Sequence, residues 1–554
     1  MNRLPQEIYD EIAAWDSEPS NLANLATISR PWQMAIERIT FRQIYLKSSD
    51  LDKFERIVRG RRRDFLGAIL YSIVLPTHCE EVHSRREAKG HHQANYEAFI
   101  SAIHCLFSIL KSWDNVECPT KSDYSIRLEI LDVYSLERER ILHPVPRQEL
   151  NAIAPHMGER DLSYSYPHLL RPAELAVLPA IYSLGVHLRS MRVVSSQVSL
   201  EIVRKLPNLR TVDWFTYDEN LSYPEQRQKN RDFFTRTIQQ QLPEISHLQS
   251  LRIFMNHGKF YNRPWIPISS RPVKDSSDPL SKSIREETAL LKGLKSLTVS
   301  GVFDEWLLWP DLKAEIVEPF WQNLEHLHIK FHTTKPSGGA YFRARTQAES
   351  TNPLFLAVSN TQMPPEYGTS EVNDIESTQN GQYSNGREHG ENFQPELLYI
   401  PDEEFISPLI EAFGRAISQM PALKVVSLTT TIAMYVSLHS ARGRVMDTTW
   451  GIWFAAPGES FDSELQKHPA FSENMGQRRL IFDVQKWRPN EHLRSILRGV
   501  GRERHGDTLV EEYIDYWSTV RRSAVLYYDR MVYLNVVREF NKRRRLLGDL
   551  KGIV

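Results

Sequence analysis

The sequence predicts an α/β fold in which a short three-helix unit at the N-terminus is followed by an irregular α/β solenoid. Two observations lead to this prediction. Within residues 4–46, large apolar residues recur three and four positions apart, which is the spacing of one face of a helix. From residue 128 onward, seven short segments alternate apolar and polar residues, as half-buried strands do.

Three short helices are expected within residues 4–46. Pro5 suits the first turn of the first helix, Ser20 or Asn21 can cap the second, and Ser29 followed by Pro31 can start the third. The expected apolar faces are Leu4, Ile8, Ile12 and Trp15, then Leu22, Leu25 and Ala26, then Ile28, Trp32, Ile36 and Ile39. A unit of this size cannot enclose so many large side chains, so we expect some of them to cover another surface.

The composite pattern LPQEIYDEI…NLANLATISRPWQMAIERITFRQIYL resembles an F-box, with Leu-Pro-x-Glu-Ile, spaced leucines and Ser-Arg-x-Trp. Its ending is similar to that of F-box proteins from filamentous fungi. The resemblance covers residues 4–46 and implies a non-catalytic subunit that docks on the adaptor of an SCF-type cullin–RING ubiquitin ligase. The residues that it implies at the adaptor interface are Leu4, Pro5, Ile8, Leu22, Leu25, Ile28 and Trp32. By the same resemblance, Ile36, Phe41 and Ile44 link the box to the next domain. A helical cap on an unrelated domain is the alternative.

The seven strand segments share one pattern: a leucine, a long polar residue, and apolar residues three and five positions after the leucine. They begin at Leu128, Leu188, Leu209, Leu248, Leu294, Leu324 and Leu423. The pattern resembles the strand segment of a leucine-rich repeat. Intervals of 21 to 99 residues make the repeat irregular, with helices such as residues 230–242 expected on the outer face.

The polar positions between the core residues of these strands point to one shared face of the predicted sheet. The expected target-binding residues on this face are Asp132, Arg192, Asp213, Arg252 and His328, alongside Thr298 and Ser427. One step further along their strands lie Tyr134, Phe215, Phe254 and Lys330. This mixture of groups suits a protein or peptide partner better than a phosphate groove. The alternative is a solvated face that binds nothing.

The predicted domains are an F-box at residues 1–46, the first part of the solenoid at 47–332, a disordered insertion at 333–394, and the solenoid end with a C-terminal helical cap at 395–554. The insertion is poor in large apolar residues, so burial cannot offset its ordering entropy. Residues 259–285, which contain four prolines, are a second predicted loop.

The composition is that of an ordinary globular protein. The 554 residues carry 68 Lys and Arg against 69 Asp and Glu, a net charge of −1 that does not favour a nucleic-acid or membrane-surface binder. Three cysteines are too few for a disulfide framework and fit a reducing compartment. No apolar run approaches about 18 residues, the length of a membrane span, so we expect a protein of the cytoplasm or nucleus.

No catalytic residue, cofactor or metal site is expected. Residues 78–92 gather four histidines, Cys79 and Glu81, but their spacing fits no standard zinc finger. The sequence lacks a complete P-loop and the common hydrolase, metalloprotease and kinase motifs. The expected partners are the SCF adaptor, through it the cullin, and an unknown protein target, without nucleic acid or membrane. A repeat scaffold outside any ligase and an enzyme with an unrecognised site are the alternatives.

Overall fold

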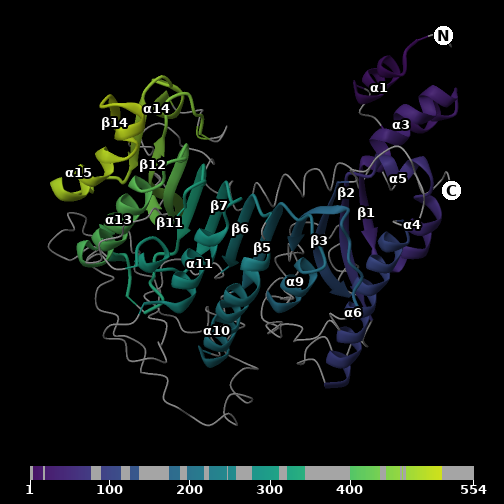
Figure 1. Ribbon diagram of the computed structural model, residues 1–554, viewed down its shortest axis with the longest axis horizontal. Coiled ribbons are helices and arrows are strands. Elements are labelled where there is room, and N and C mark those ends of the chain that lie inside the picture. Colours follow the sequence, from purple (N-terminus) through teal and green to yellow (C-terminus); the bar gives the residue numbers. More distant parts are fainter. Residues whose placement is uncertain are drawn as a thin grey trace.

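The computed structural model describes residues 4–15, 19–76, 89–113, 125–135, 174–186, 196–217, 224–245, 247–256, 277–310, 321–337, 339–343, 400–436, 444–461, 465 and 469–514. These residues form a mixed α/β structure around one large, mostly parallel sheet of 12 strands (Figure 1). The predicted α/β class is therefore confirmed.

The strands of the large sheet lie side by side in chain order. Nine strands run parallel to one another: β1 (Gln43–Lys47), β2 (Ala68–Leu75), β3 (Ile126–Ser135), β4 (Ile181–Val186), β5 (Thr211–Tyr217), β6 (Ser250–Asn256), β7 (Ser296–Gly301), β8 (His326–Phe331) and β11 (Val425–Val436). The next strand, β12 (Arg444–Ala455), is antiparallel to both of its neighbours. The last two, β13 (Arg478–Asp483) and β14 (Leu509–Tyr513), are parallel to each other.

Helices pack on one face of this sheet and bury its apolar side chains. Figure 1 shows α6 (Lys89–Ser112), α10 (Pro224–Gln241), α11 (Pro279–Leu290) and α13 (Glu403–Ser418) along the same side of the strand row. Alternate residues of each strand enter one continuous core, among them Leu251, Ile253, Leu297, Val299, Leu327 and Ile329. Shorter helices are α4 (Leu51–Ile57), α5 (Arg61–Phe65), α9 (Ser196–Val203), α14 (Pro469–Ser472), α15 (Glu491–Gly499) and α16 (Arg502–His505).

A repeated turn leads into β5, β6, β7, β8 and β11. At each turn a buried leucine precedes a long polar residue: Leu209, Leu248, Leu294, Leu324 and Leu423. The backbone N–H of Gln249 donates to the carbonyl of Arg210 over 2.8 Å, and Lys295 donates to Gln249 in the same way over 2.8 Å. Glu325 and Lys424 continue this ladder of hydrogen bonds. Five of the seven predicted strand segments are thereby confirmed as strand starts.

The other two segments were misplaced or cannot be judged. Leu128 lies inside β3 opposite Ile69, rather than at the turn before the strand. The register of β3 on β2 shifts at Leu131, so Asp132 lies one row further along the sheet than we expected. Residues 187–195, which include Leu188 and Arg192, lie outside the described residues, and the strand between β3 and β5 is β4 at 181–186.

Two loop predictions were wrong at one end. Tyr341 and Phe342 fall within the predicted disordered insertion, yet both are buried, because the Tyr341 hydroxyl donates to the Phe303 carbonyl and β9 (Phe342–Arg343) pairs with β10 (Ile400–Pro401). The predicted loop at 259–285 ends earlier, since Asp278 caps α11 by accepting a hydrogen bond from the Ser281 N–H. Residues 344–399 and the predicted C-terminal cap beyond 514 lie outside the described residues.

Candidate functional site

The N-terminal unit consists of α1 (Gln6–Trp15), α2 (Pro19–Ala26) and α3 (Arg30–Arg42), as predicted. It has a small core of its own, built from Tyr9, Ala13, Ala35 and Ile36. Leu22, Leu25 and Trp32 pack against this core, and the rings of Tyr9 and Trp32 meet edge to face with centroids 5.2 Å apart. These three side chains, expected at the adaptor interface, are thus half-buried within the unit.

The same unit exposes a set of large apolar side chains, which we call the N-terminal patch: Leu4, Ile8, Ile12 and Ile28. They are four of the seven exposed large apolar residues in the described part of the chain. The first helix buries Tyr9 and Ala13, and it exposes Leu4 and Ile8, which we expected at the adaptor interface. Clustering of this kind on one small unit is typical of a protein-binding surface. Of these four, Ile12 was absent from the expected interface, although its spacing of four from Ile8 could have indicated it.

The N-terminal unit is attached firmly to the sheet, at the end of the strand row far from β14 (Figure 1). The third helix, α3, continues directly into β1, so the predicted domain boundary at residue 46 falls inside a strand. Buried Glu37 of α3 receives hydrogen bonds from Arg61 and Arg62 of α5, at 3.2 Å and 2.9 Å. Burial raises the pKa of Glu37, but the hydrogen bonds and charges of the two arginines outweigh it and lower that pKa overall.

The face of the sheet opposite the helices carries polar side chains, and we call its part on β5 to β8 the polar face. Strand register places Asp213, Arg252, Thr298 and His328 side by side in one row, which Ser427 of β11 continues. The structure thus brings together Asp213, Arg252 and His328, as predicted from their alternation. Asp132 lies one row further along, opposite Ser72, and Glu129 takes its place in the row.

Several contacts fix this row. Nη1 of Arg252 lies 3.6 Å from Oδ2 of Asp213, and Nδ1 of His328 lies 2.9 Å from the Ser427 hydroxyl. Burial raises the pKa of Asp213; the Arg252 charge opposes this rise, and the Glu129 charge adds to it. In the next row the rings of Phe215 and Phe254 stack with centroids 4.5 Å apart.

The polar face ends at β11, because a second core covers the same side of β11, β12 and β13. This core joins Val425, Trp453, Ala455 and Ile481 of the strands to Phe461 and Phe471. Buried Arg479 fastens the covering segment by donating to the Phe471 carbonyl over 2.8 Å. Nothing in the strand alternation indicated this second core.

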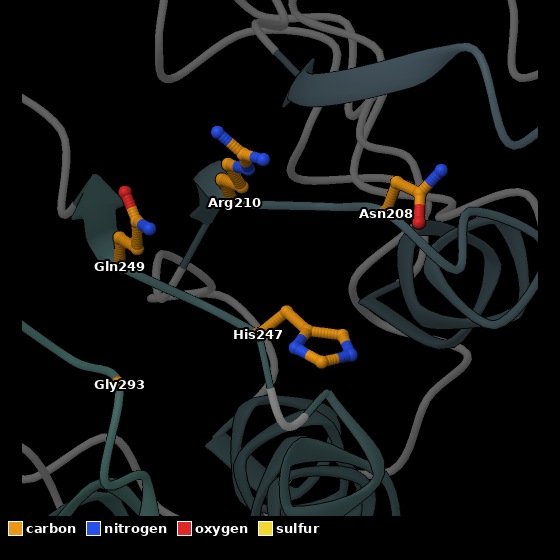
Figure 2. Close-up of a pocket in the computed structure, with 5 residues that line it drawn as sticks. All are labelled: Asn208, Arg210, His247, Gln249 and Gly293. Atoms are coloured by element: carbon orange, nitrogen blue, oxygen red, sulfur yellow. The ribbon is translucent and has the colours of Figure 1, made fainter. Parts of the chain in front are cut away.

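A separate hollow of about 460 Å³ lies at the turns before β5, β6 and β7 (Figure 2). Asn208, Arg210, His247, Gln249 and Gly293 line it, and Figure 2 shows the Arg210 and Gln249 side chains pointing the same way. The Asn208 amide donates to the Pro179 carbonyl over 2.9 Å, so this side chain stabilises the turns. Organic ligands prefer mostly apolar walls, which these lining residues do not supply.

Neither a metal site nor a membrane helix occurs in the described part of the chain. No group of three or more His, Cys, Asp or Glu side chains there is placed to hold a metal ion. The side chains of the histidine-rich segment at 78–92 lie outside the described residues. No described helix is both long and apolar enough to cross a membrane.

Comparisons with known proteins do not identify a family. No protein-family model matches the chain, and no curated protein matches it at a significant level.

Proposed function

We propose that this protein is the substrate-recognition subunit of an SCF-type cullin–RING ubiquitin ligase. Residues 4–46 act as an F-box that docks on the adaptor, and the polar face binds a protein target. The observation that carries this proposal is the N-terminal patch, since Leu4, Ile8, Ile12 and Ile28 are exposed on a unit that already has its own core. Covering them on a partner removes apolar surface from water.

The order of the strands supports a receptor domain of the leucine-rich-repeat kind. Each strand from β1 to β8 lies next to the strand before it, and the helices between them return on one side. Stacked strand–helix units of this type form solenoids, which bind partners over extended surfaces. The repeat is irregular, and β12 interrupts the parallel order near its end.

This chain acts by positioning its two partners next to each other, and it catalyses no step itself. The adaptor holds the N-terminal unit, the polar face holds the target, and enzymes of the ligase deliver ubiquitin to a target lysine. Joining both partners to one body raises the effective concentration of that lysine at the ligase. The direct run of α3 into β1 and the Glu37 contacts favour a fixed geometry between the two binding surfaces.

Co-purification of the full chain with the SCF adaptor subunit tests the proposal. Ile28→Ser is the test variant and Leu290→Ser is its matched control, because these side chains are 63% and 65% exposed and only Ile28 belongs to the patch. We expect the wild type and Leu290→Ser to retain the adaptor and Ile28→Ser to lose most of it. Circular dichroism checks that each variant is folded.

Half-buried Trp32 and Leu25 are poorer choices for substitution, since they also support the small core. A wild-type chain that does not bind the adaptor would overturn the ligase assignment. The protein would then be a repeat scaffold with a partner of another kind on its N-terminal patch.

A further inference from the structure

The polar face has a strip of small hydroxyl side chains with longer side chains on both sides of it. The strip is Ser296, Thr298 and Ser300 on β7. Register pairs Thr298 with Arg252 of β6 on one side and with His328 of β8 on the other. In the next row Ser300 lies between Phe254 and Lys330.

The strip and its flanks are close enough to contact one bound group together. Neighbouring strands lie about 4.8 Å apart and successive rows about 6.8 Å apart, so the backbones of Arg252 and Lys330, two strands and one row apart, are separated by about 12 Å. Long side chains such as those of Arg252 and Lys330 reach across half of this distance. A side chain of a bound segment that lies over β7 is therefore within reach of both cations and of the two hydroxyl groups.

The charge of this area is of one sign. None of the polar-face residues of β6, β7 and β8, which include Arg252, His326, His328 and Lys330, is acidic. Asp213 on neighbouring β5 is acidic, and its carboxylate pairs with Arg252 at 3.6 Å. Guanidinium, ammonium and hydroxyl groups all donate hydrogen bonds, and the first two are the usual partners of carboxylate and phosphoryl oxygens.

We infer that the polar face recognises an acidic segment of the target protein. Its carboxylate or phosphoryl group lies over Thr298 and Ser300, between Arg252 and Lys330. An adjoining apolar residue packs on the stacked rings of Phe215 and Phe254, which are only partly buried. This inference rests on the proposed function in taking the ligand to be a target protein. The choice of an anionic group rests on the side chains of the polar face alone.

Fluorescence anisotropy with short labelled peptides tests the inference on the full chain. Three probes share a Gly/Ser background and differ at the centre, which is Glu-Leu, phosphoserine-Leu or Lys-Leu. We expect at least one acidic probe to bind and the Lys-Leu probe not to bind. Tighter binding of the phosphoserine probe assigns a phosphoryl group, and equal binding of both acidic probes assigns a carboxylate.

Arg252→Gln and Lys330→Gln should each weaken the binding of the acidic probe about tenfold, the usual effect of losing one charged hydrogen bond. Lys292→Gln is the matched control, because Lys292 is an exposed lysine at the turn before β7 and outside the polar face. Equal affinity of all three variants and the wild type would overturn the inference. So would binding of the Lys-Leu probe, or failure of both acidic probes at millimolar concentration.

The adaptor experiment separates this result from the proposed function. Arg252→Gln and Lys330→Gln leave the N-terminal patch intact, so both variants should retain the adaptor as the wild type does. Loss of the acidic probe with the adaptor retained supports the inference. Absence of adaptor binding in the wild type would remove the ligase assignment and leave the peptide measurements to decide the chemistry of the face.

Discussion

Arg231 and Asp278 form an ion pair that is buried on both sides. Nη2 of Arg231 lies 2.8 Å from Oδ2 of Asp278, and the two side chains are 8% and 7% exposed. The pair joins α10 to the N-cap of α11. The same carboxylate oxygen accepts hydrogen bonds from the N–H and hydroxyl of Ser281, at 2.9 Å and 2.7 Å.

Arg231→Met should destabilise the protein by about 3 to 5 kcal/mol, because it leaves the buried Asp278 carboxylate without its cation. Urea unfolding measures this change. Arg204→Met is the control: its partner Glu244 lies 2.9 Å away, but the side chains are 45% and 53% exposed. An exposed pair contributes less than about 1 kcal/mol. Equal losses of unfolding free energy in the two variants would show that burial does not make the Arg231–Asp278 pair more important than an exposed pair.

Asp304 lies in the same network and should make stability depend on pH. One carboxylate oxygen accepts the Asp278 N–H over 2.8 Å and the other accepts the Trp306 N–H over 3.1 Å. Burial, with smaller contributions from the charges of Asp278 and Glu305, raises the Asp304 pKa from 3.8 to about 7. The folded state therefore holds this proton more tightly than the unfolded state.

The resulting stability is fully present below pH 3.8 and is lost as the pH rises to about 7. Over that window the free energy of unfolding should fall by an amount on the order of 4 kcal/mol from this residue. Asp304→Asn should flatten this part of the pH profile, measured by chemical unfolding at several pH values. Asp402→Asn, at the N-cap of α13, is the control. A wild-type slope that persists in Asp304→Asn would show that another group titrates.

The strands that we predicted correctly are those whose signal is local. Leu209, Leu248, Leu294, Leu324 and Leu423 each occupy the same buried place at a turn, and the alternation that follows reports which face is covered. At β3 the local signal misleads, because the register shift at Leu131 moves Asp132 one row further along the sheet. A register shift depends on the neighbouring strand, which alternation within one segment does not report.

The candidate site likewise has one part that follows from local sequence patterns and another part that does not. The row of Asp213, Arg252 and His328 follows from a period of two, so the sequence predicts it. The second core on β11 to β13 arises from Phe461 and Phe471, which lie in a segment with no alternation of its own. On α1 the spacing of Leu4, Ile8 and Ile12 indicates one shared apolar face, but it does not report that the small core takes Tyr9 and Ala13 and leaves this face exposed.

Glu37→Gln should loosen the attachment of the N-terminal unit. The carboxylate receives hydrogen bonds from Arg61 and Arg62, and an amide oxygen cannot replace both charged contacts. We expect a loss of about 2 kcal/mol in unfolding free energy. Since the Glu37 pKa is lowered from 4.5, its contribution is present above that pH and is lost as the pH falls below it.

The difference between wild type and Glu37→Gln should therefore shrink under acidic conditions. Denaturant unfolding at neutral pH and near pH 3 measures it. A difference that does not change with pH would mean that the side chain acts through packing and not through its charge.

Gly451 of β12 should not tolerate a side chain. A Cβ atom there would lie 2.8 Å from Cη2 of Trp453, 2.9 Å from Cγ2 of Thr429 and 3.0 Å from the Leu428 carbonyl oxygen. Gly451→Ala should therefore displace Trp453, which belongs to the second core, and lower the unfolding free energy by about 1 to 3 kcal/mol.

At Gly476 a Cβ atom would meet nothing within 4 Å, so Gly476→Ala is the matched control and should change stability by less than about 1 kcal/mol. Thermal unfolding compares the two variants. If both substitutions were tolerated equally, the close packing of β11 and β12 around this glycine would be disproved.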